Sequence, residues 1–163
     1  MALIGELALE NVRRDGGPFA AGVWDLEQNR WVSAGVNLVL SSNLSSAHAE
    51  IVAISLAQTS LGSWDLGDNS RRLELVSSAE PCAMCTGAVP WSGVVSLVFG
   101  AARTDAEAAG FDEGAKPQRW KSELAQRGVQ VAGPVQAVAA RQALKDFASR
   151  NPPYNGRPRP ATG

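Results

Sequence analysis

SAHAE at residues 46–50 and PCAMC at residues 81–85 contain the single histidine and both cysteines of this 163-residue chain. Any chemistry that needs an imidazole or a thiol must therefore arise from these two segments. Structural zinc sites surround the metal with four protein ligands, whereas catalytic sites use three and leave one position for water. Three soft ligands with no fourth in the sequence therefore predict a catalytic zinc site formed by His48, Cys82 and Cys85.

The cysteine segment has the features of a helix N-terminus. Pro81 suits the first helical position, where its missing N–H removes no hydrogen bond. We expect a helix from Pro81 to about Val89, which would place Cys82 and Cys85 one turn apart on one face. The positive end of a helix favours thiolate over thiol, as metal binding requires. On its own a CxxC motif favours a redox pair or two inert buried thiols, and it is the histidine segment that favours zinc.

Glu50 lies two residues after His48, and two such side chains do not share a face of a helix. They can converge only in the first turn, with the metal beyond the end of the helix. The residues three, four and seven positions from Glu50 are apolar: Ala47, Ala53, Ile54 and Ala57. A carboxylate on this face is expected to be buried and to need a partner. A solvated surface glutamate is the usual alternative, but the apolar neighbours favour a proton-transfer role beside the metal.

The overall composition predicts one domain and a reducing compartment. A chain of this length can bury a core of its own. The formal net charge of −1 and the pI of about 5.8 provide no overall basic field for nucleic acid or an anionic membrane. Two cysteines three positions apart do not form the disulfide framework of a secreted protein. Glu6 and Glu10 interrupt the apolar N-terminal stretch that a secretory signal would need, so we expect a cytoplasmic protein.

Residues 81–102 carry no formal charge and are long enough to span a bilayer. Gly87, Pro90 and Gly93 interrupt this stretch, and a β-branched run follows at 94–99. We interpret it as a helix, a turn and a buried strand, not as a membrane span. Pro90 is expected to end or kink that helix.

The remaining periodicities alternate between helix and strand. They predict helices at 1–14, 47–61, 81–89 and 116–127 and one that starts at 134, strands at 19–24, 31–36, 73–77, 94–99 and 129–132, and a serine-rich loop at 41–46. This order predicts an α/β fold, a three-layer α/β/α sandwich with a central mixed five-stranded sheet. Functional sites of such sheets form where strand ends meet helix N-termini. We expect residues 1–150 to form the single domain and residues 151–163 to form a proline-rich tail whose end is disordered.

His-Ala-Glu followed by Pro-Cys-x-x-Cys resembles the signature of the zinc-dependent cytidine deaminase-like superfamily. Other segments resemble the bacterial guanine deaminases of that superfamily: GGPFA at 16–20, VN at 36–37, SAEPC at 78–82 and AGFDEG at 109–114. The resemblance extends from the first helix to about Tyr154. It implies one zinc ion per chain, held by His48, Cys82 and Cys85, and a small purine base as substrate.

For the chemistry, the resemblance implies hydrolytic deamination of guanine to xanthine and ammonia, with ammeline and related triazines as further candidate substrates. Glu50 would move protons between water and the base, and Glu113 would help to move them to the leaving amine. From the residues alone, Glu113 is also well explained as a solvated turn residue between two glycines. Its neighbour Asp112 is an alternative for the same position in the pocket.

Base binding is expected in a planar apolar slot with few hydrogen-bonding groups. The resemblance implies an amide from Asn37, aromatic walls from Phe19 and Trp91, the backbone N–H of Ala49 and a closing ring from Tyr154. From the residues alone, Asn37 can equally satisfy backbone groups at a strand end. The two aromatic rings can belong to the core, and Tyr154 can lie on the surface. Related enzymes close the pocket with a C-terminal tyrosine of either subunit, which implies a homodimer with exchange of C-terminal segments.

Several other functions stay open on the sequence. Deamination of cytosine, cytidine, guanosine or tRNA adenosine would use the same zinc motifs. A nucleic-acid substrate favours a basic surface, however, which this chain has only in its tail. A non-catalytic zinc-stabilised binding module would not need Glu50. A thiol redox protein is disfavoured because the proline precedes the CxxC motif instead of lying inside it.

Overall fold

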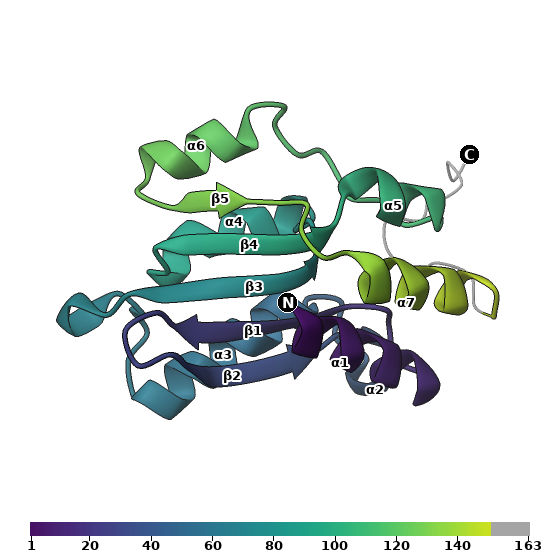
Figure 1. Cartoon of the computed structure of the whole chain (residues 1–163), viewed down its shortest axis with the longest axis horizontal. Coiled ribbons are helices and arrows are strands. Elements are labelled where there is room, and N and C mark those ends of the chain that lie inside the picture. Colours follow the sequence, from purple (N-terminus) through teal and green to yellow (C-terminus); the bar gives the residue numbers. More distant parts are fainter. Residues whose placement is uncertain (151–163) are drawn as a thin grey trace, which may run out of the picture.

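The computed structural model describes residues 1–150. It contains one five-stranded sheet in the order β2-β1-β3-β4-β5 (Figure 1). The strands are β1 (Ala20–Asp25), β2 (Arg30–Val36), β3 (Leu73–Ala79), β4 (Ser96–Ala101) and β5 (Gln130–Ala132). β1 is antiparallel to β2 and β3, whereas β4 is parallel to β3 and β5. The predicted mixed five-stranded sheet is therefore confirmed.

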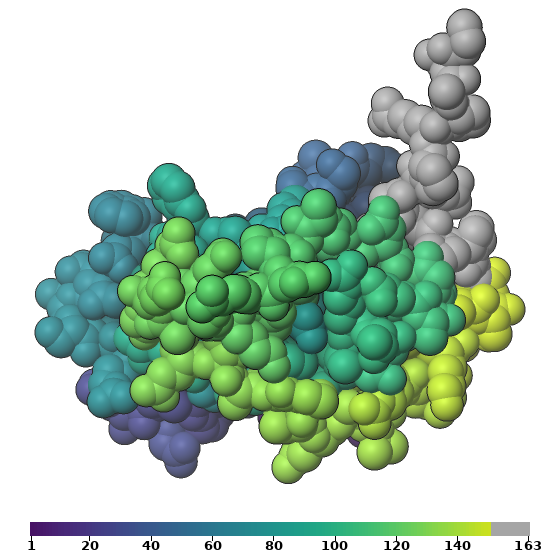
Figure 2. All heavy atoms as spheres, turned by 90° about the horizontal axis from the view of Figure 1, so that it is seen from above, coloured from purple at the N-terminus to yellow at the C-terminus, as the bar shows by residue number. Residues whose placement is uncertain are grey.

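Helices cover both faces of this sheet. They are α1 (Ala2–Arg13), α2 (Val39–Ser42), α3 (Ala49–Leu61), α4 (Ala83–Ser92), α5 (Arg103–Ala108), α6 (Trp120–Gln126) and α7 (Val138–Ala148). In Figure 1, α1 and α7 lie in front of the sheet, and α3 and α4 lie behind it. The view from above shows α5 and α6 at the surface (Figure 2). The molecule thus has the three layers that the sequence predicts.

Alternation along the strands divides the core into two halves, because successive side chains point to opposite faces of a sheet. On β3, Leu75 packs into the half that contains residues of α3 and α4, whereas Val76 packs against α1 and α7. Phe99 of β4 lies in the first half and Phe147 of α7 in the second. β3 is therefore buried on both faces. The segment that contains the cysteines follows directly after the end of this strand.

Two helices begin later than predicted. α3 begins at Ala49, with His48 as its N-cap, and α4 begins at Ala83, with Cys82 as its N-cap. Pro81 therefore precedes the N-cap of α4 and does not occupy the first helical position. Candidate ligands thus occupy the N-cap of each helix.

The uncharged stretch 81–102 forms α4, a turn and β4, as predicted. α4 continues through Pro90 to Ser92, so of the two predicted effects of Pro90, an end or a kink of the helix, the first is wrong. Pro90 lacks the N–H that would bond to a carbonyl one turn earlier. Because it lies in the last turn of α4, the helix loses this one hydrogen bond close to its end. None of the helices within residues 1–150 is long and apolar enough to cross a bilayer.

Other boundaries differ for reasons of backbone conformation. α6 begins at Trp120 instead of 116, because Pro117 disfavours a helical backbone at the residue before it. α7 begins at Val138 instead of 134, because Gln136 has a φ of 44° in the left-handed region. α5 was not predicted, and α2 extends into the predicted loop at 41–46.

Candidate active site

The N-terminal end of α3 positions the histidine and the glutamate. His48 is the N-cap and Glu50 lies in the first turn, so both side chains lie at the end of the helix. Glu50 is 7% exposed, and Ala53 and Ala57 on the same face are fully buried. The predicted burial of the Glu50 carboxylate is therefore confirmed.

The end of β3 and the start of α4 bring the cysteines to the same place. β3 ends at Ala79, and Cys82 is the N-cap of α4. Cys85 follows in the first turn of α4 and is buried, whereas Cys82 is half-buried. The two thiols therefore approach His48 from one helix end, as the sequence predicts.

The distances among these three side chains fit one tetrahedral metal ion. The Sγ atom of Cys82 lies 3.5 Å from Nδ1 of His48, and that of Cys85 lies 3.6 Å from the same nitrogen. All three candidate ligand atoms lie within 4.8 Å of one another. A tetrahedral centre with Zn–S bonds of about 2.3 Å and a Zn–N bond of about 2.05 Å requires an S···N separation of about 3.6 Å. These residues can therefore hold zinc without rearrangement.

The two thiols have opposite acidities in the chain itself. The interaction with the neighbouring Cys85 thiol is the main cause that lowers the pKa of Cys82 to about 4, although burial opposes it. The same interaction, together with burial and the nearby Glu50 carboxylate, raises the pKa of Cys85. Cys82 is thus a thiolate at neutral pH, whereas Cys85 must lose its proton to a base when a metal binds.

The Glu50 carboxylate is held from two sides. Its Oε1 accepts a hydrogen bond from the Ser77 hydroxyl at 3.3 Å, and its Oε2 accepts one from the Cys85 thiol at 3.4 Å. Burial raises the pKa of Glu50, and the negative charge of Cys82 raises it further. A carboxyl group whose pKa is raised in this way is suited to exchanging a proton with a neighbouring group.

Glu113 and not Asp112 faces the pocket. Glu113 is 4% exposed, whereas Asp112 is exposed and accepts a hydrogen bond from the N–H of Gly114 at 2.8 Å. The preceding Phe111 is buried and packs edge-on against Phe19, with ring centroids 4.9 Å apart. Burial, and then the charges of Cys82 and Glu50, raise the pKa of Glu113 to about 8. Glu113 is therefore protonated at neutral pH and can donate that proton.

Asn37 is buried, and both of its oxygens accept hydrogen bonds, whereas its side-chain nitrogen has no partner within residues 1–150. It is 1% exposed, and its Oδ1 accepts a hydrogen bond from the N–H of Val39 at 3.1 Å. Its backbone oxygen accepts one from Asn11 at 2.9 Å. The Nδ2 group of Asn37 has no partner among the described residues. Because a buried donor without a partner is costly, this amide is suited to an acceptor on a ligand.

Eight side chains line the pocket that these groups share: Phe19, Asn37, His48, Glu50, Ala79, Glu80, Cys82 and Glu113. Six of them are site residues that the sequence predicts, and Ala79 and Glu80 are additions. Ala49 is the first residue of α3, where the backbone N–H has no acceptor in a preceding turn. The sequence feature that could predict the place of Glu80 is its position between a strand and a candidate ligand.

The structure does not bring Trp91 to this pocket. Its side chain is 83% exposed and lies in a separate groove with Pro117 and Trp120. Tyr154 lies outside the described residues. The pocket within residues 1–150 therefore has one of the two predicted aromatic walls, Phe19.

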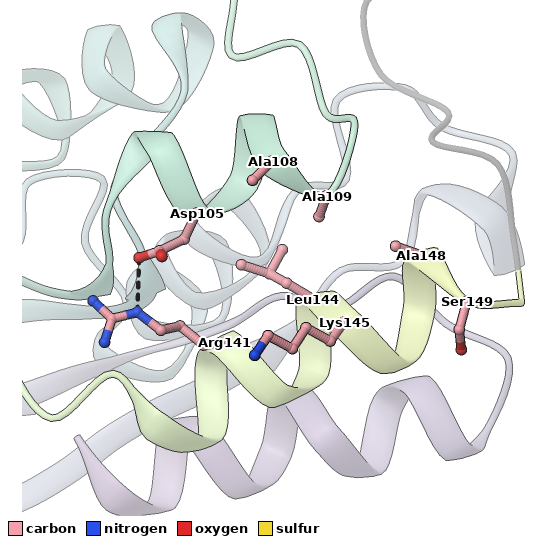
Figure 3. A pocket seen from close by; sticks show the side chains of 8 residues that line it. All are labelled: Asp105, Ala108, Ala109, Arg141, Leu144, Lys145, Ala148 and Ser149. Carbon is pink, nitrogen blue, oxygen red and sulfur yellow. Dashed lines mark hydrogen bonds and ion pairs between the residues drawn. The ribbon is translucent and has the colours of Figure 1, made fainter.

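A larger hollow lies between α5 and α7 (Figure 3). Its lining residues are Asp105, Ala108, Ala109, Arg141, Leu144, Lys145, Ala148 and Ser149. Arg141 and Asp105 form an ion pair across it, with Nε and Oδ2 3.0 Å apart. No predicted site residue contributes to this hollow, and the predicted residues gather instead at the narrower pocket beside His48.

Comparison with known proteins agrees with this geometry. The guanine deaminase of Bacillus subtilis (strain 168) is 40% identical over 108 residues, which cover 66% of this chain and 65% of that protein. The match thus spans less than two thirds of that relative's own length.

Two solved structures share the fold at higher coverage. A structure described as guanine deaminase from Nitrosomonas europaea has a TM-score of 0.87 and 45% identity, covering 91% of this chain and 82% of that chain. The structure of NE0047 in complex with 2,6-diaminopurine has a TM-score of 0.89 and 46% identity, covering 92% of this chain and 80% of that chain.

The family itself follows from the match to a family model. Residues 1–101 match the model of the cytidine and deoxycytidylate deaminase zinc-binding region, and this span includes His48, Glu50, Cys82 and Cys85. With most of its length matched, and with a ligand set of the right geometry, the chain belongs to the zinc-binding family of cytidine and deoxycytidylate deaminases.

Proposed function

We propose that this protein is a zinc-dependent guanine deaminase, which converts guanine and water into xanthine and ammonia. One observation carries the proposal: two candidate zinc ligands, His48 and Cys82, line one pocket with the buried Glu50 carboxylate and the free amide donor of Asn37, and the ligand atom of Cys85 lies within 4.8 Å of the other two. The relatives named guanine deaminase, and the 2,6-diaminopurine complex of NE0047, support a purine base as the substrate.

His48, Cys82 and Cys85 would hold one zinc ion per chain. Zinc in such a site supplies a bound water whose pKa falls from about 15.7 toward 7. Cys82 needs no activation, because its pKa is about 4. Cys85 must release a proton, and the Glu50 oxygen 3.4 Å from its sulfur is an acceptor for it.

Glu50 and Glu113 would divide the proton transfers. Glu50 would accept a proton from the attacking water and pass it to a ring nitrogen of guanine. Glu113, which is protonated at neutral pH, would donate a proton to the amino group on C2. A C–O bond forms at C2 and the C–N bond breaks, so that nitrogen leaves as ammonia and no redox partner is needed.

Three groups would orient the base. The free Nδ2 of Asn37 would donate a hydrogen bond to an acceptor on the purine edge, and the N–H of Ala49 would bind a carbonyl oxygen. Phe19 would form one wall of the slot, where its ring is fixed by Phe111. This division of labour, with an apolar wall and few polar groups, is typical of a small-molecule site.

We further propose a homodimer in which a partner subunit covers the outer side of α4. Trp91 and Met84, seven positions apart on that helix, are 83% and 41% exposed. Exposed aromatic and methionine side chains are enriched at protein interfaces. Trp91 would then form part of an interface, and Tyr154, outside the described residues, would close the pocket of its own or the partner subunit. Light scattering should give twice the chain mass of 17.1 kDa, and Trp91→Ser should shift this toward the monomer.

Both thiols must be reduced to bind the metal, which favours the cytoplasm as the compartment. We therefore propose that the enzyme acts there on free base. An oxidised Cys82–Cys85 pair in freshly isolated protein would argue against this placement.

An ammonia-release assay on the purified protein tests the proposed function. Guanine should be turned over at least about tenfold faster than guanosine, cytosine, cytidine or adenine, and this tenfold ratio corresponds to about 1.4 kcal/mol in activation free energy. Ammeline should be a slower substrate than guanine. A tRNA anticodon stem-loop provides the competing substrate. Turnover of that RNA, without turnover of any free base, would contradict the proposal.

A further inference from the structure

Lys116 is a lysine buried beside the candidate active site. Its side chain is 1% exposed, whereas lysine side chains normally reach solvent. A buried ammonium group needs charged or hydrogen-bonded partners, because its desolvation is otherwise uncompensated. The partners of Lys116 therefore indicate what it does.

Two of the three partners of the ammonium group belong to the segment that leads into Cys82. Nζ of Lys116 forms an ion pair with Oε1 of Glu80, a residue that lines the pocket. It also donates a hydrogen bond to the carbonyl oxygen of Pro81 at 2.8 Å, and it lies 4.5 Å from the ring centroid of Trp120. Pro81 directly precedes the candidate ligand Cys82. The ammonium group thus holds the segment that ends at a zinc ligand.

The backbone of Lys116 belongs to the loop that presents Glu113. Gly114 has a φ of 73°, which turns the chain after Glu113, and its carbonyl accepts a hydrogen bond from the Lys116 N–H at 2.9 Å. The carbonyl of Glu113 accepts one from the N–H of Ala83 at 2.9 Å. Two links therefore join this loop to the start of α4, one through the backbone and one through the Lys116 side chain.

Charge gives a second reason for the lysine. Three carboxyl groups line the pocket, those of Glu50, Glu80 and Glu113. Among the ion pairs of residues 1–150, that of Lys116 is the one whose acidic partner lines the pocket. The second oxygen of Glu80 accepts a hydrogen bond from the N–H of Arg103 at 3.5 Å. Both carboxylate oxygens of Glu80 are thus engaged, one by Lys116 and the other by the N–H of Arg103.

From these contacts we propose that Lys116 is a positioning residue, which fixes the loop of Glu113 against the segment from Glu80 to Cys82. The proton donor Glu113 is thereby held at a constant position relative to the metal site. This inference rests on the proposed function, since Glu113 is the group that it positions. Lys116 touches no substrate in this arrangement. It acts through Glu80, Pro81 and Glu113.

A double-mutant cycle tests the proposal. Lys116→Met removes the charge and leaves an unbranched side chain that is one atom shorter, and Glu80→Gln removes the opposite charge. Lys116→Met should lower kcat for guanine at least about tenfold, with KM within about threefold and zinc near one per chain. The Lys116→Met/Glu80→Gln double variant should be no slower than Lys116→Met alone, because no unpaired carboxylate is then left. If the two losses in kcat multiplied, the coupling would be absent and the proposal wrong.

Lys121→Met is the matched control. Lys121 is exposed, and its ammonium group lies 5.6 Å from the same Trp120 ring and 3.3 Å from the Gly133 oxygen. This variant should retain wild-type kcat. A merely structural Lys116 would lower the melting temperature of Lys116→Met without changing kcat per zinc-loaded chain, and that result would overturn the proposal.

Hydrogen exchange supplies a readout that does not depend on guanine. In Lys116→Met the amides of Ala83 and Lys116 should exchange at least about tenfold faster, while amides in α1 stay protected. Unchanged exchange at both amides would overturn the proposal. If the wild-type chain turned over no guanine, the proposed function would fail, and exchange would still decide the role of Lys116. Should Lys116→Met not fold, Glu80→Gln, which keeps the shape of the side chain, must show the same faster exchange.

Discussion

The Cys85 thiol donates a hydrogen bond to the Glu50 carboxylate, with Sγ and Oε2 3.4 Å apart. The other carboxylate oxygen accepts from Ser77 of β3 at 3.3 Å. In the metal-free chain Glu50 is therefore oriented by a strand and by a neighbouring helix, and both contacts are shielded from solvent. When Cys85 gives up its proton to bind a metal, the Ser77 hydroxyl is still a donor to Glu50. A proton carrier held in this way needs little reorganisation before it reacts, which is how a fixed geometry contributes to rate.

Glu50→Gln should abolish most of the activity and spare the metal. Glutamine keeps the size of the side chain and its contact with Ser77, but it cannot carry a proton. Turnover of guanine should fall about 10²–10⁴-fold, the usual contribution of a general acid–base. Zinc should stay near one per chain, because Glu50 is outside the ligand set.

The ammonia assay and elemental analysis, performed on the same sample, check this expectation. Glu6→Gln on the exposed side of α1 is the matched control and should leave both readings unchanged. Substantial turnover by Glu50→Gln would remove the proton carrier from the mechanism.

Asn37→Asp should weaken base binding and preserve the fold. The aspartate keeps an oxygen for the Val39 N–H and loses the donor that has no partner among the described residues. We expect kcat/KM for guanine to fall about 10–100-fold, since a lost hydrogen bond and a new unpaired acceptor are each worth about 1–2 kcal/mol. Steady-state kinetics measures it.

The control is Asn43→Asp, at an exposed position with a φ of 56° that aspartate also tolerates. It should behave as wild type. If Asn37→Asp lost no more activity than Asn43→Asp, the amide of Asn37 would have no role in binding.

Local patterns predicted much of this site because its ligands sit next to element ends. The apolar neighbours of Glu50 at helical spacing predict a buried carboxylate, and the CxxC spacing predicts that Cys82 and Cys85 lie within one turn of a helix. Strands were predicted because alternation and β-branched runs depend on adjacent residues. Helix starts were less predictable: α3 begins at Ala49 and not at Ala47, because the backbone of His48 is extended, and that conformation is set by the loop before it.

Contacts between residues far apart in the sequence could not be predicted from local patterns. The ion pair between Lys116 and Glu80 joins residues 36 positions apart, and a lone lysine before Pro117 has no feature that predicts burial. The choice between Asp112 and Glu113 depended on a turn in which Asp112 binds the Gly114 N–H and so points outward. The exposure of Trp91 likewise reflects which face of α4 meets the sheet.

Alkylation should distinguish the two cysteines. In metal-free protein at pH 6, iodoacetamide should modify Cys82 at least about tenfold faster than Cys85, because only the thiolate reacts. Cys82 has a pKa of about 4 and is half-buried, whereas Cys85 has a raised pKa and is buried. Tandem mass spectrometry locates the label within the shared peptide.

Zinc provides the control for this experiment. Stoichiometric zinc should protect both cysteines, since both sulfurs would be ligands. Faster labelling of Cys85 than of Cys82, or no protection by zinc, would contradict the assigned thiolate and ligand set.

Glu113→Gln should change how stability depends on pH. The pKa of Glu113 in the folded chain is about 8, above its ordinary value of 4.5. Between these values the folded chain keeps a proton that the unfolded chain has released, so the contribution of Glu113 to the free energy of unfolding falls as pH rises from about 4.5 to 8 and levels off above that. Glu50, whose pKa is also raised, acts in the same direction, whereas Cys82, whose pKa is lowered from 9.0 to about 4, acts in the opposite direction. Removing Glu113 should therefore make the slope of the free energy of unfolding against pH less negative.

Urea unfolding of metal-free protein at pH 5 and pH 8 measures this slope. The difference in free energy of unfolding between Glu113→Gln and wild type should be more favourable to the variant at pH 8 than at pH 5, by about 1 kcal/mol or more. One pKa unit corresponds to about 1.4 kcal/mol. Asp112→Asn is the control, because Asp112 is exposed and its amide replacement can still accept from Gly114. It should keep the wild-type slope. If Glu113→Gln kept that slope as well, Glu113 would be ionised in the folded chain at neutral pH, and it could not serve as the proton donor to the leaving amine.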